Sequence, residues 1–267
     1  MSVYPGKPKM VIDLNCDMGE GFGAYTIGDD PQMLTIVSSA NIACGFHAGD
    51  PRVMHQTLKM AEANGVQSGA HPGFLDLFGF GRRQIRGDSL EEIEWQIIYQ
   101  IGALQGLAKS LGVKVRHVKT HGSLGNMAAE DSELAMAVAR AILAVDPELI
   151  FVVMPGLETE RAGERLGLPL AREIYADRAY ADTGNLLPRK VEGAVIHDAV
   201  VARERVLEMV REGAIVTASG ARLPARIDSI CVHGDTPGAV AMAREIRHGL
   251  EGLGIAIRPM SEVIASR

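Results

Sequence analysis

The stretch MVIDLNCDM, residues 10–18, gives the clearest indication of the fold because its polar and apolar residues alternate. Asp13, Asn15 and Asp17 would share one face of a strand, and the apolar residues between them would share the other. A strand inside an open parallel sheet is covered by helices on both faces and is apolar throughout. The alternation favours a barrel strand whose polar face lines a lumen, with an edge strand that has one solvated face as the alternative.

Short β-rich runs alternate with longer helical patterns along the whole chain, which is typical of βα units around a parallel sheet. Capping residues mark the helices, as at Asp50 before Pro51 and at Ser89 with Glu92. Strands are predicted at 10–17, 38–46, 66–71, 113–120, 149–154, 169–176 and 227–233, with a short eighth candidate at 255–260. Helices are predicted at 50–65, 89–112, 131–144, 157–166, 198–213 and 235–253. No linker divides the chain, so residues 1–267 are expected to form one barrel domain.

Composition narrows the class of partner. The 267 residues are 47% hydrophobic, carry a formal net charge of −6 and contain no dense run of Lys or Arg, which argues against nucleic acid and anionic membranes. No apolar stretch approaches the roughly 18 residues of a membrane helix, and the first ten residues lack a signal-peptide core. Three cysteines without a CxxC motif suggest reducing surroundings. We expect a soluble cytoplasmic protein with a small-molecule substrate.

Four predicted strands end in a histidine. His47 in CGFHAGD, His71 in GAHPG, His121 in KTHGS and His233 in VHGD each follow an apolar run. A single one of them could be structural, but surface histidines would not track strand ends. Histidines lining the mouth of a barrel would do so, because catalytic groups emerge at that end.

The fourth strand, VRHVKTHG, places His117, Lys119 and His121 on one face. Burial lowers the pKa of such a lysine unless a carboxylate, such as Asp13 or Asp17, pairs with it. A paired lysine can polarise a carbonyl or bind a carboxylate, and a neutral one can act as a base. The alternative is a lysine that extends from the strand end into solvent.

Two loops carry further polar residues. EIYADRAYADTGNLLPR supplies Arg178 and Arg189, which could hold a substrate carboxylate or form solvated ion pairs. GFGRRQIRG supplies three arginines for a lid, an anion site or a partner surface, namely Arg82, Arg83 and Arg86.

Other candidates have plainer explanations. Asp50 and Asp235 open predicted helices, so capping is their expected role. Cys44 precedes His47 by three residues, yet a small buried thiol is the more common use of such a residue than a nucleophile, and Cys16 faces the apolar side of its strand.

Three common motifs are excluded. The chain has no GxxxxGK[ST] and no HExxH. GEGFGA, residues 19–24, matches GxGxxG/A after a strand, but YTIGDDP does not continue as a helix. Asp17 and Glu20 would also repel a pyrophosphate. The glycines are therefore interpreted as space for backbone and substrate beside Glu20.

A set of motifs carries a family resemblance over nearly the whole chain. IDLNCDMGEGFG, SANIACGFHAGDP, GAHPGFLDLFGFGRR, HVKTHGSLGNMAA, IYADRAYADTGNLLPR, GAVIHD and CVHGDTPGAV occur in the order typical of the family. The chain resembles the LamB/YcsF family of 5-oxoprolinase A subunits. Where that family usually reads HVKPHGALYN, this chain has Thr120, Ser123 and Gly125 in place of proline, alanine and tyrosine. Loss of an aromatic side chain beside Lys119 could alter the substrate.

The resemblance implies a distorted seven-stranded (β/α) barrel, a TIM-like fold of the glycoside hydrolase/deacetylase type. It also implies ATP-dependent opening of the lactam 5-oxo-L-proline (pyroglutamate) to L-glutamate, with two further subunits, B and C. A lactam is a resonance-stabilised amide that closes again readily, so coupling to ATP, by phosphorylation of the lactam oxygen, would supply the driving force. The missing P-loop fits an arrangement in which the partners handle ATP and this subunit receives the activated lactam.

The resemblance and the residue patterns together give a set of site predictions. The catalytic candidates, with Asp13 or Asp17 as general base, are Asp13, Asp17, Glu20, Lys119 and His121. The substrate-binding candidates are Asn15, His47, His71, Arg178, Tyr180, His233 and Asp235. Related deacetylases bind a divalent metal with an Asp and two His, for which the candidates here are Asp17, His47 and His121. Met18 stands where some of these relatives have a second acid, which weakens the metal prediction.

Two rival functions stay open. One is a stand-alone, metal-dependent amide or carbohydrate deacetylase, which would need neither ATP nor partners. The other is a non-catalytic subunit that binds substrate.

Overall fold

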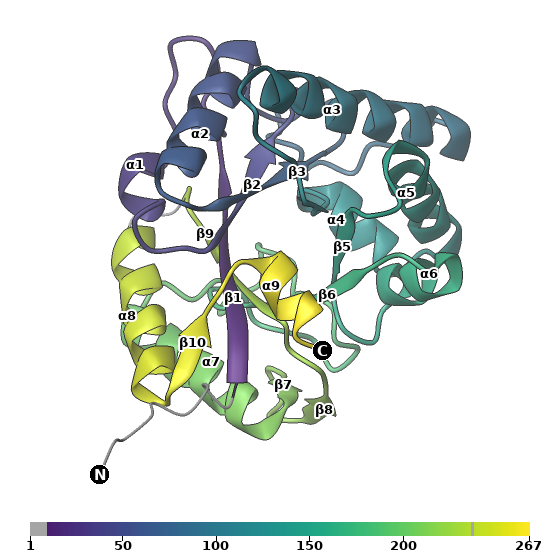
Figure 1. The fold of residues 1–267 in the computed structure, drawn as a ribbon. Helices are drawn as coiled ribbons and strands as arrows, with labels where there is room; N and C mark the ends of the chain where they lie inside the picture. The colour runs from purple at the N-terminus through teal and green to yellow at the C-terminus, as the bar shows by residue number, and fades with distance from the viewer. Residues whose placement is uncertain (1–9, 236–237) are drawn as a thin grey trace.

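Strand β1 (Met10–Met18) is one of the strands of a closed parallel ring in the computed structural model, which describes residues 10–235 and 238–267 (Figure 1). Its C-terminal half pairs with β2 on one side and β9 on the other. The β6–β9 pairing closes the ring. The seven strands, in ring order, are β1, β2 (Ser39–Ala43), β3 (Gln67–His71), β4 (His117–Val118), β5 (Ile150–Val153), β6 (Leu170–Tyr175) and β9 (Ser229–His233). The predicted seven-stranded α/β barrel is confirmed.

An eighth parallel strand extends the sheet outside the ring. β10 (Ile255–Ile257) pairs with the first three residues of β1, from Met10 to Ile12. β1 therefore has different neighbours along its length: its start is held by β10 and its end belongs to the barrel. The remaining strands, β7 (Ala214–Val216) and β8 (Arg222–Pro224), form a separate antiparallel pair that the sequence patterns did not predict.

Most helices surround the ring on its outer side, whereas α9 (Met260–Ala265) lies across one end of it, where Met260 packs against Ile150, Val152 and Ala171 (Figure 1). The capping box predicted at Ser89 and Glu92 forms, and the Asp50 carboxylate accepts the backbone N–H groups of Arg52 and Val53. The helices are α1 (Asp30–Met33), α2 (Pro51–Ala63), α3 (Leu90–Ser110), α4 (Gly122–Ala128), α5 (Ser132–Val145), α6 (Glu158–Leu166), α7 (Ala199–Glu212), α8 (Ala239–Gly252) and α9 (Met260–Ala265). Of these, α1, α4 and α9 were not predicted, because their four to seven residues are too short for a clear helical period.

The fourth strand is much shorter than the predicted range 113–120. Only His117 and Val118 have regular strand pairing. The extended chain nevertheless continues beside β3, since Lys119 donates its backbone N–H to Ala70 O and His121 donates to Pro72 O. Every second residue of this segment therefore keeps its orientation, which is the property that positions the site.

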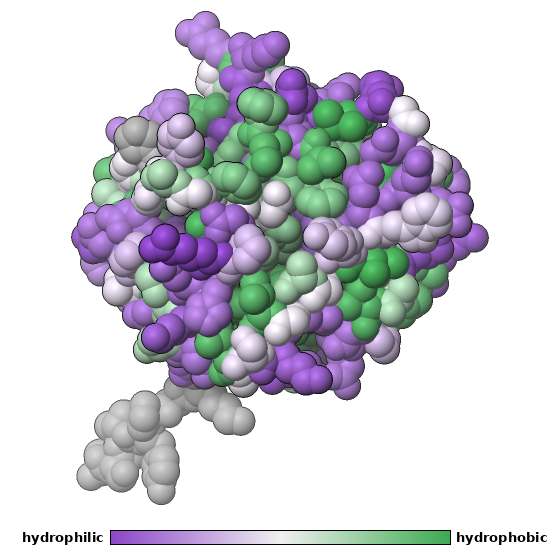
Figure 2. Space-filling view, turned by 90° about the horizontal axis from the view of Figure 1, so that it is seen from above, coloured by the Kyte–Doolittle hydropathy of each residue, from purple (hydrophilic) through white to green (hydrophobic). Residues whose placement is uncertain are grey.

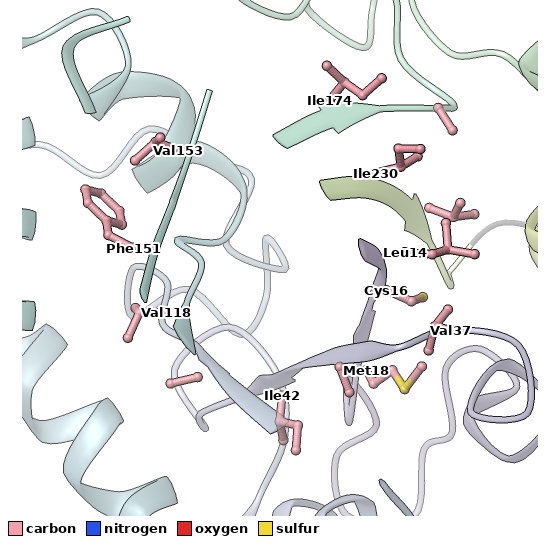
Figure 3. Packing of buried hydrophobic residues seen from close by; sticks show 14 of the residues in the cluster. Leu14, Cys16, Met18, Val37, Ile42, Val118, Phe151, Val153, Ile174 and Ile230 are labelled. Atoms are coloured by element: carbon pink, nitrogen blue, oxygen red, sulfur yellow. The ribbon is translucent and has the colours of Figure 1, made fainter. Parts of the chain in front are cut away.

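The two faces of the ring differ in polarity, as the alternation in β1 predicts. Leu14, Cys16 and Met18 are buried among apolar side chains between the ring and its helices, and Figure 3 shows such residues around the outside of the ring. Asp13, Asn15 and Asp17 point to the inside, where each contacts a polar residue of another strand. An outer apolar shell therefore encloses a polar lumen.

The lower part of the lumen is a closed hydrogen-bond network around Asp13. The hydroxyl groups of Ser38, Ser39 and Ser229 all donate to its carboxylate. Burial nevertheless raises the pKa of Asp13 to about 6, because the loss of hydration outweighs these hydrogen bonds. Asp13 is thus sealed below the site and held by hydroxyls.

The outer surface seen in Figure 2 mixes hydrophilic and apolar residues. Among the helices in the described ranges, none has both the length and the apolar character to cross a bilayer.

The stability of the fold should depend on pH through Asp13. The folded protein holds this proton up to about pH 6, whereas the unfolded chain releases it near the ordinary pKa of 3.8, so ionisation destabilises the fold. Its contribution to the free energy of unfolding is full below about pH 4 and declines as pH rises through 6, by about 3 kcal/mol in total. Urea unfolding between pH 4 and 7.5 should show that Asp13→Asn lacks this decline. The exposed Glu62→Gln is the control, and identical pH slopes in the two variants would contradict the assignment.

Candidate active site

A buried ion pair lies at the upper end of the lumen. Lys119 Nζ is 2.7 Å from Asp17 Oδ1, 3.0 Å from Cys231 Sγ and 3.7 Å from Glu173 Oε2. Burial disfavours the charged form of Lys119, but Asp17 outweighs it and raises the pKa of the lysine well above its usual value. Burial likewise opposes ionisation of Asp17, yet His71 and Lys119 lower its pKa far below the ordinary range. The two groups are therefore an ammonium and a carboxylate.

His71 and His121 face each other beside this pair. His71 Nδ1 lies 2.7 Å from Lys119 O, and His121 Nε2 lies 2.8 Å from Phe80 O. Because a carbonyl oxygen only accepts, both nitrogens must carry a proton. The two remaining nitrogens, His71 Nε2 and His121 Nδ1, are 3.0 Å apart, so a hydrogen bond between them needs one further proton on one ring. Asp17 Oδ2, 3.2 Å from His71 Nε2, supplies the matching negative charge.

Glu20 and His47 form the far side of the same cluster. Glu20 Oε1 is 3.5 Å from both His47 Nε2 and His121 Nδ1, and the His47 ring stacks on the His121 ring at 3.6 Å. Burial and repulsion from Asp17 raise the pKa of Glu20 well above its usual value. Glu20 Oε1 and both ring nitrogens of His47 have no hydrogen-bond partner among the described residues.

This cluster could hold a divalent metal. Glu20, His47, His71 and His121 offer ligand atoms within 4.8 Å of one another, and three imidazoles with one carboxylate suit zinc. The parallel rings of His47 and His121 set a limit, because a lone pair lies in the plane of its ring and two stacked rings cannot both aim at one ion. As arranged, Glu20, His71 and one of the stacked histidines form a three-ligand set.

A second group, Asp17, Cys231 and His233, is less suited to a metal. Its ligand atoms are also close together. Lys119, however, already occupies the space with its ammonium, bonded to both Asp17 and Cys231. Burial also raises the pKa of the Cys231 thiol, which disfavours the thiolate that binds metal.

His233 is held by a carboxylate. Its Nδ1 lies 2.9 and 2.8 Å from the two oxygens of Asp177, and its Nε2 is 3.9 Å from Asp17 Oδ2. Burial would raise the pKa of Asp177, but His233 lowers it below the usual value. An ionised carboxylate that accepts Nδ1–H leaves Nε2 as the basic nitrogen. This dyad can take a proton from a group in the cavity.

A cavity of about 570 Å³ opens above these groups. Of the predicted site residues, those that line it are Asp17, His71, Lys119, His121, Arg178 and His233. The predicted site residues that lie behind or beside its walls are Asp13, Asn15, Glu20, His47, Tyr180 and Asp235. Tyr180 is fully buried, and its hydroxyl oxygen accepts the backbone N–H of Tyr175 at 2.7 Å. Tyr180 thus supports the sixth strand from within the apolar shell.

Two arginines of the loop GFGRRQIRG form ion pairs, one of them with the predicted helix cap Asp235. Arg82 lines the cavity and pairs with Asp235 at 2.7 Å, whereas Arg83 pairs with Asp76. Asp235 does not cap α8, whose N-cap is Gly238, so this expectation was wrong. Cys44 is buried, and its pKa is raised to about 12 by burial, which fits a packing thiol.

Glycine lets the loop between β3 and α3 lie directly on the histidines. Gly81 has a φ of 63°, and a Cβ atom there would be 2.6 Å from His121 Cδ2 and 2.7 Å from His47 Cβ. At Gly73 a Cβ atom would be 2.9 Å from His47 Nδ1. The glycine-rich motifs GAHPG and GFGRR therefore serve close backbone packing over the rings.

Five residues of the site were not predicted, and one of them is Asp177, which holds His233. Glu173, buried beside Lys119, and Tyr175, whose ring centre is 5.2 Å from Lys119 Nζ, both come from β6. The alternation in LAREIY, residues 170–175, was an available signal, because it puts both on one face. Asn41 donates to Asn15 and Asp17, and Cys231 contacts Lys119; neither residue has a distinctive sequence pattern.

The residues that depart from the family pattern line the cavity. Thr120, Ser123 and Gly125 all lie in its wall. A Cβ atom at Gly125 would be 2.9 Å from Thr120 Oγ1, so a larger residue at 125 requires a shift at 120. The side chains at positions 120 and 125 therefore compete for the same space in the cavity wall.

Breaking the ion pair should destabilise the protein in a way that a second change repairs. Lys119→Met leaves Asp17 buried without its partner and should lower the free energy of unfolding by about 3–5 kcal/mol. Adding Asp17→Asn removes the stranded charge and should recover at least about 2 kcal/mol of that loss. Urea unfolding measures both.

A matched control uses the exposed pair of Lys114 and Glu148. Lys114→Met should cost less than about 1 kcal/mol. A similarly small loss for Lys119→Met would show that the buried pair has no special role.

The chain is similar to known proteins over nearly its whole length. A model of the LamB/YcsF family matches residues 12–265. The 5-oxoprolinase A subunit of Rhodopseudomonas palustris (strain ATCC BAA-98 / CGA009) is 56% identical over 252 residues, which cover 94% of this chain and 99% of that protein. The corresponding 5-oxoprolinase A subunit of Natranaerobius thermophilus is 51% identical over 250 residues, covering 94% of this chain and 97% of that protein.

Solved structures of other proteins have the same fold. The lactam utilization protein from Thermus thermophilus has a TM-score of 0.87 at 43% identity, covering 93% of this chain and 99% of that chain. T48 deacetylase, with a TM-score of 0.51 at 15% identity over 96% of this chain and 92% of that chain, shares the fold alone. The chain belongs to the LamB/YcsF family.

Proposed function

We propose that this protein is the subunit of an ATP-dependent 5-oxoprolinase that opens the lactam of 5-oxo-L-proline to give L-glutamate. The names of its relatives support the substrate and the presence of partner subunits, for which we propose two, B and C. The observation that carries the proposal is the pairing of a buried ammonium, Lys119, with the His233–Asp177 dyad at one cavity. Amide hydrolysis needs these two elements, a cation for the oxyanion and a base for water.

The proposed reaction begins with water beside His233. Nε2 of His233 takes a proton as the water oxygen bonds to the lactam carbonyl carbon, and Asp177 holds the ring in the required tautomer. Lys119 has three N–H groups, of which Asp17 and Cys231 receive two. The third is available to the oxyanion that forms on the carbonyl oxygen.

Ring opening then breaks the bond between the carbonyl carbon and nitrogen. The leaving nitrogen needs a proton, and we assign its delivery to the shared proton of His71 and His121. Overall, water supplies a hydroxyl group to the carbonyl carbon and a proton to the nitrogen, which gives the carboxylate and amine of glutamate. At the end of the cycle His233 gives up the proton that it took from water, and the pair of His71 and His121 regains the proton that it donated.

The two aspartates of β1 receive different roles in this proposal. Asp17 has a low pKa, which makes it a weak base, so its contribution is to hold Lys119 and His71 in place. Asp13 lies below the cavity and supports the ring. Coupling to ATP is assigned to the partners, because this chain contains no P-loop motif.

A second candidate is a stand-alone metal-dependent deacetylase. The cluster of Glu20 with three histidines favours it, since it could hold a divalent metal, and a bound zinc would polarise a carbonyl and lower the pKa of water. A third, the non-catalytic substrate-binding subunit, predicts that changes at the dyad do not affect turnover.

Reconstitution separates the three candidates. The complete complex with ATP and 5-oxoproline should release glutamate, and omission of this chain, of ATP or of either partner should abolish it. His233→Gln should lower kcat of the assembled complex by at least about 100-fold, because a positioned general base contributes roughly 10²- to 10⁴-fold. The exposed His248→Gln, on α8, is the control and should leave kcat unchanged.

Two results would overturn the proposal. Glutamate formation without this chain, or at the normal rate with His233→Gln, would favour the non-catalytic subunit. Deacetylase activity of the chain alone that a chelator abolishes would favour the metal-dependent enzyme.

A further inference from the structure

We propose that Glu173 accepts the N–H group of the lactam, so that Glu173 and Lys119 together recognise the amide edge of a small cyclic amide. The inference deepens the proposed function and rests on it for the ring that enters the cavity. Lys119 by itself contacts only the carbonyl oxygen, which lactams share with lactones. Glu173 would therefore be the residue that selects a lactam.

A five-membered lactam presents its polar groups differently from a peptide. An open-chain amide is almost always trans, so its carbonyl oxygen and its N–H point in opposite directions. A five-membered ring closes only over a cis amide, which puts the carbonyl oxygen and the N–H on one edge. A site that matches this edge needs a donor and an acceptor side by side.

Lys119 and Glu173 are such a donor and acceptor. Both line the cavity, and Lys119 Nζ is 3.7 Å from Glu173 Oε2, which is longer than a hydrogen bond. Two N–H groups of Lys119 are used by Asp17 and Cys231, and the third is available to a carbonyl oxygen. A carboxylate oxygen accepts more than one hydrogen bond, so Oε2 can accept the neighbouring N–H of the same edge.

Asn15 fixes which group Glu173 turns toward the cavity. Asn15 Nδ2 donates to Glu173 Oε1 at 2.7 Å and to Ser229 Oγ at 2.7 Å. The Ser229 hydroxyl already donates to Asp13, so its oxygen can only accept, and the atom of Asn15 that faces it must be the amide nitrogen. Oε1 is thereby held below, and Oε2 is the oxygen beside Lys119.

The acids that line the cavity in the described part of the chain are Asp17, Glu130 and Glu173. Asp17 directs one oxygen at Lys119 and the other at His71, and Glu130 is exposed to solvent. Glu173 is therefore the buried acid of this lining that keeps an oxygen for a ligand beside the ammonium.

The acceptor role needs the ionised form of Glu173. Burial raises the pKa of this carboxyl group, and the positive charge of Lys119 is the main influence that opposes the shift. The Asn15 amide and the Lys119 ammonium both present donors, which favour the carboxylate. The N–H of a bound lactam would add a further donor.

Glu173→Gln changes the hydrogen-bonding character of this point with little change in shape. Because Asn15 Nδ2 is a donor, the glutamine would turn its oxygen toward Asn15 and its NH₂ group toward the cavity. The variant therefore presents a donor where the wild type presents an acceptor. A lactone, which has a ring oxygen in place of the N–H, suits the variant better than a lactam does.

Calorimetric titration of the purified full chain with two matched ligands tests the assignment. The wild type should bind 5-oxo-L-proline at least about tenfold more tightly than 5-oxotetrahydrofuran-2-carboxylate, the lactone of the same ring size. Glu173→Gln should weaken binding of the lactam at least about tenfold and bring the two affinities within about threefold of each other. Circular dichroism checks its fold, and the exposed Glu62→Gln, which removes the same charge, should keep the wild-type preference.

Turnover by the assembled complex gives a second readout, which a merely structural role would not produce. Glu173→Gln should raise KM for 5-oxo-L-proline at least about tenfold and change kcat less than KM, because the hydrogen bond forms when the lactam binds.

Three results would overturn the role of Glu173: equal affinity of the wild type for lactam and lactone, an unchanged preference in Glu173→Gln, or no binding of either ligand to the wild type. His233-dependent glutamate release by the complex would in each case leave the proposed function standing. Conversely, lactam-selective binding by a chain that the complex does not need for glutamate release would support the role of Glu173 and refute the proposed function.

Discussion

The buried ion pair of Lys119 and Asp17 is the interaction on which the upper barrel depends. Both groups lie inside the ring, where an unpaired charge would be strongly unfavourable, so the fourth strand must place its lysine against the first. The first strand can offer Asp17 only because its polar residues all face inward. The closed ring, the alternation in the first strand and the buried ion pair therefore depend on one another, and the helices cover the apolar outer face of the ring.

Around this pair the chain arranges groups that differ in their affinity for protons. Asp17 stays ionised, while burial raises the pKa of Glu20 and Asp13. His71 and His121 each direct one ring nitrogen at a backbone carbonyl oxygen, and their other two ring nitrogens lie 3.0 Å apart. A site with a fixed ammonium, two facing imidazoles and a carboxylate-held imidazole supports the proposed amide cleavage, which needs a cation for the oxyanion and groups that move protons.

Much of the architecture could be predicted because it follows from local patterns. Alternation in residues 10–18 predicted the polar lumen, and histidines at strand ends predicted where a site would form.

The composition of the cluster could not be derived in this way: Glu20 joins His47 and His121 because the loop after β1 folds back, and loop paths depend on tertiary packing. Asp177, which follows the sixth strand and was not among the predicted site residues, holds His233 through the same dependence on tertiary packing. Tyr180 was predicted to bind substrate, yet it is fully buried and its hydroxyl accepts a backbone N–H inside the apolar shell. The close approach of Thr120 and Gly125 depends on how neighbouring turns of the chain pack, so the structure was needed to find it.

The central claim is that the Lys119–Asp17 pair serves the reaction as well as the fold, and the double variant Lys119→Met/Asp17→Asn separates these roles. Because this variant removes both charges of the pair together, it should fold and enter the complex, as circular dichroism and size-exclusion chromatography would check. The measurement is the rate of glutamate release by the assembled complex with ATP and 5-oxoproline. We expect kcat to fall by at least about 100-fold, because the cation for the oxyanion is lost. A folded, assembled double variant whose kcat stays within about threefold of the wild type would contradict it.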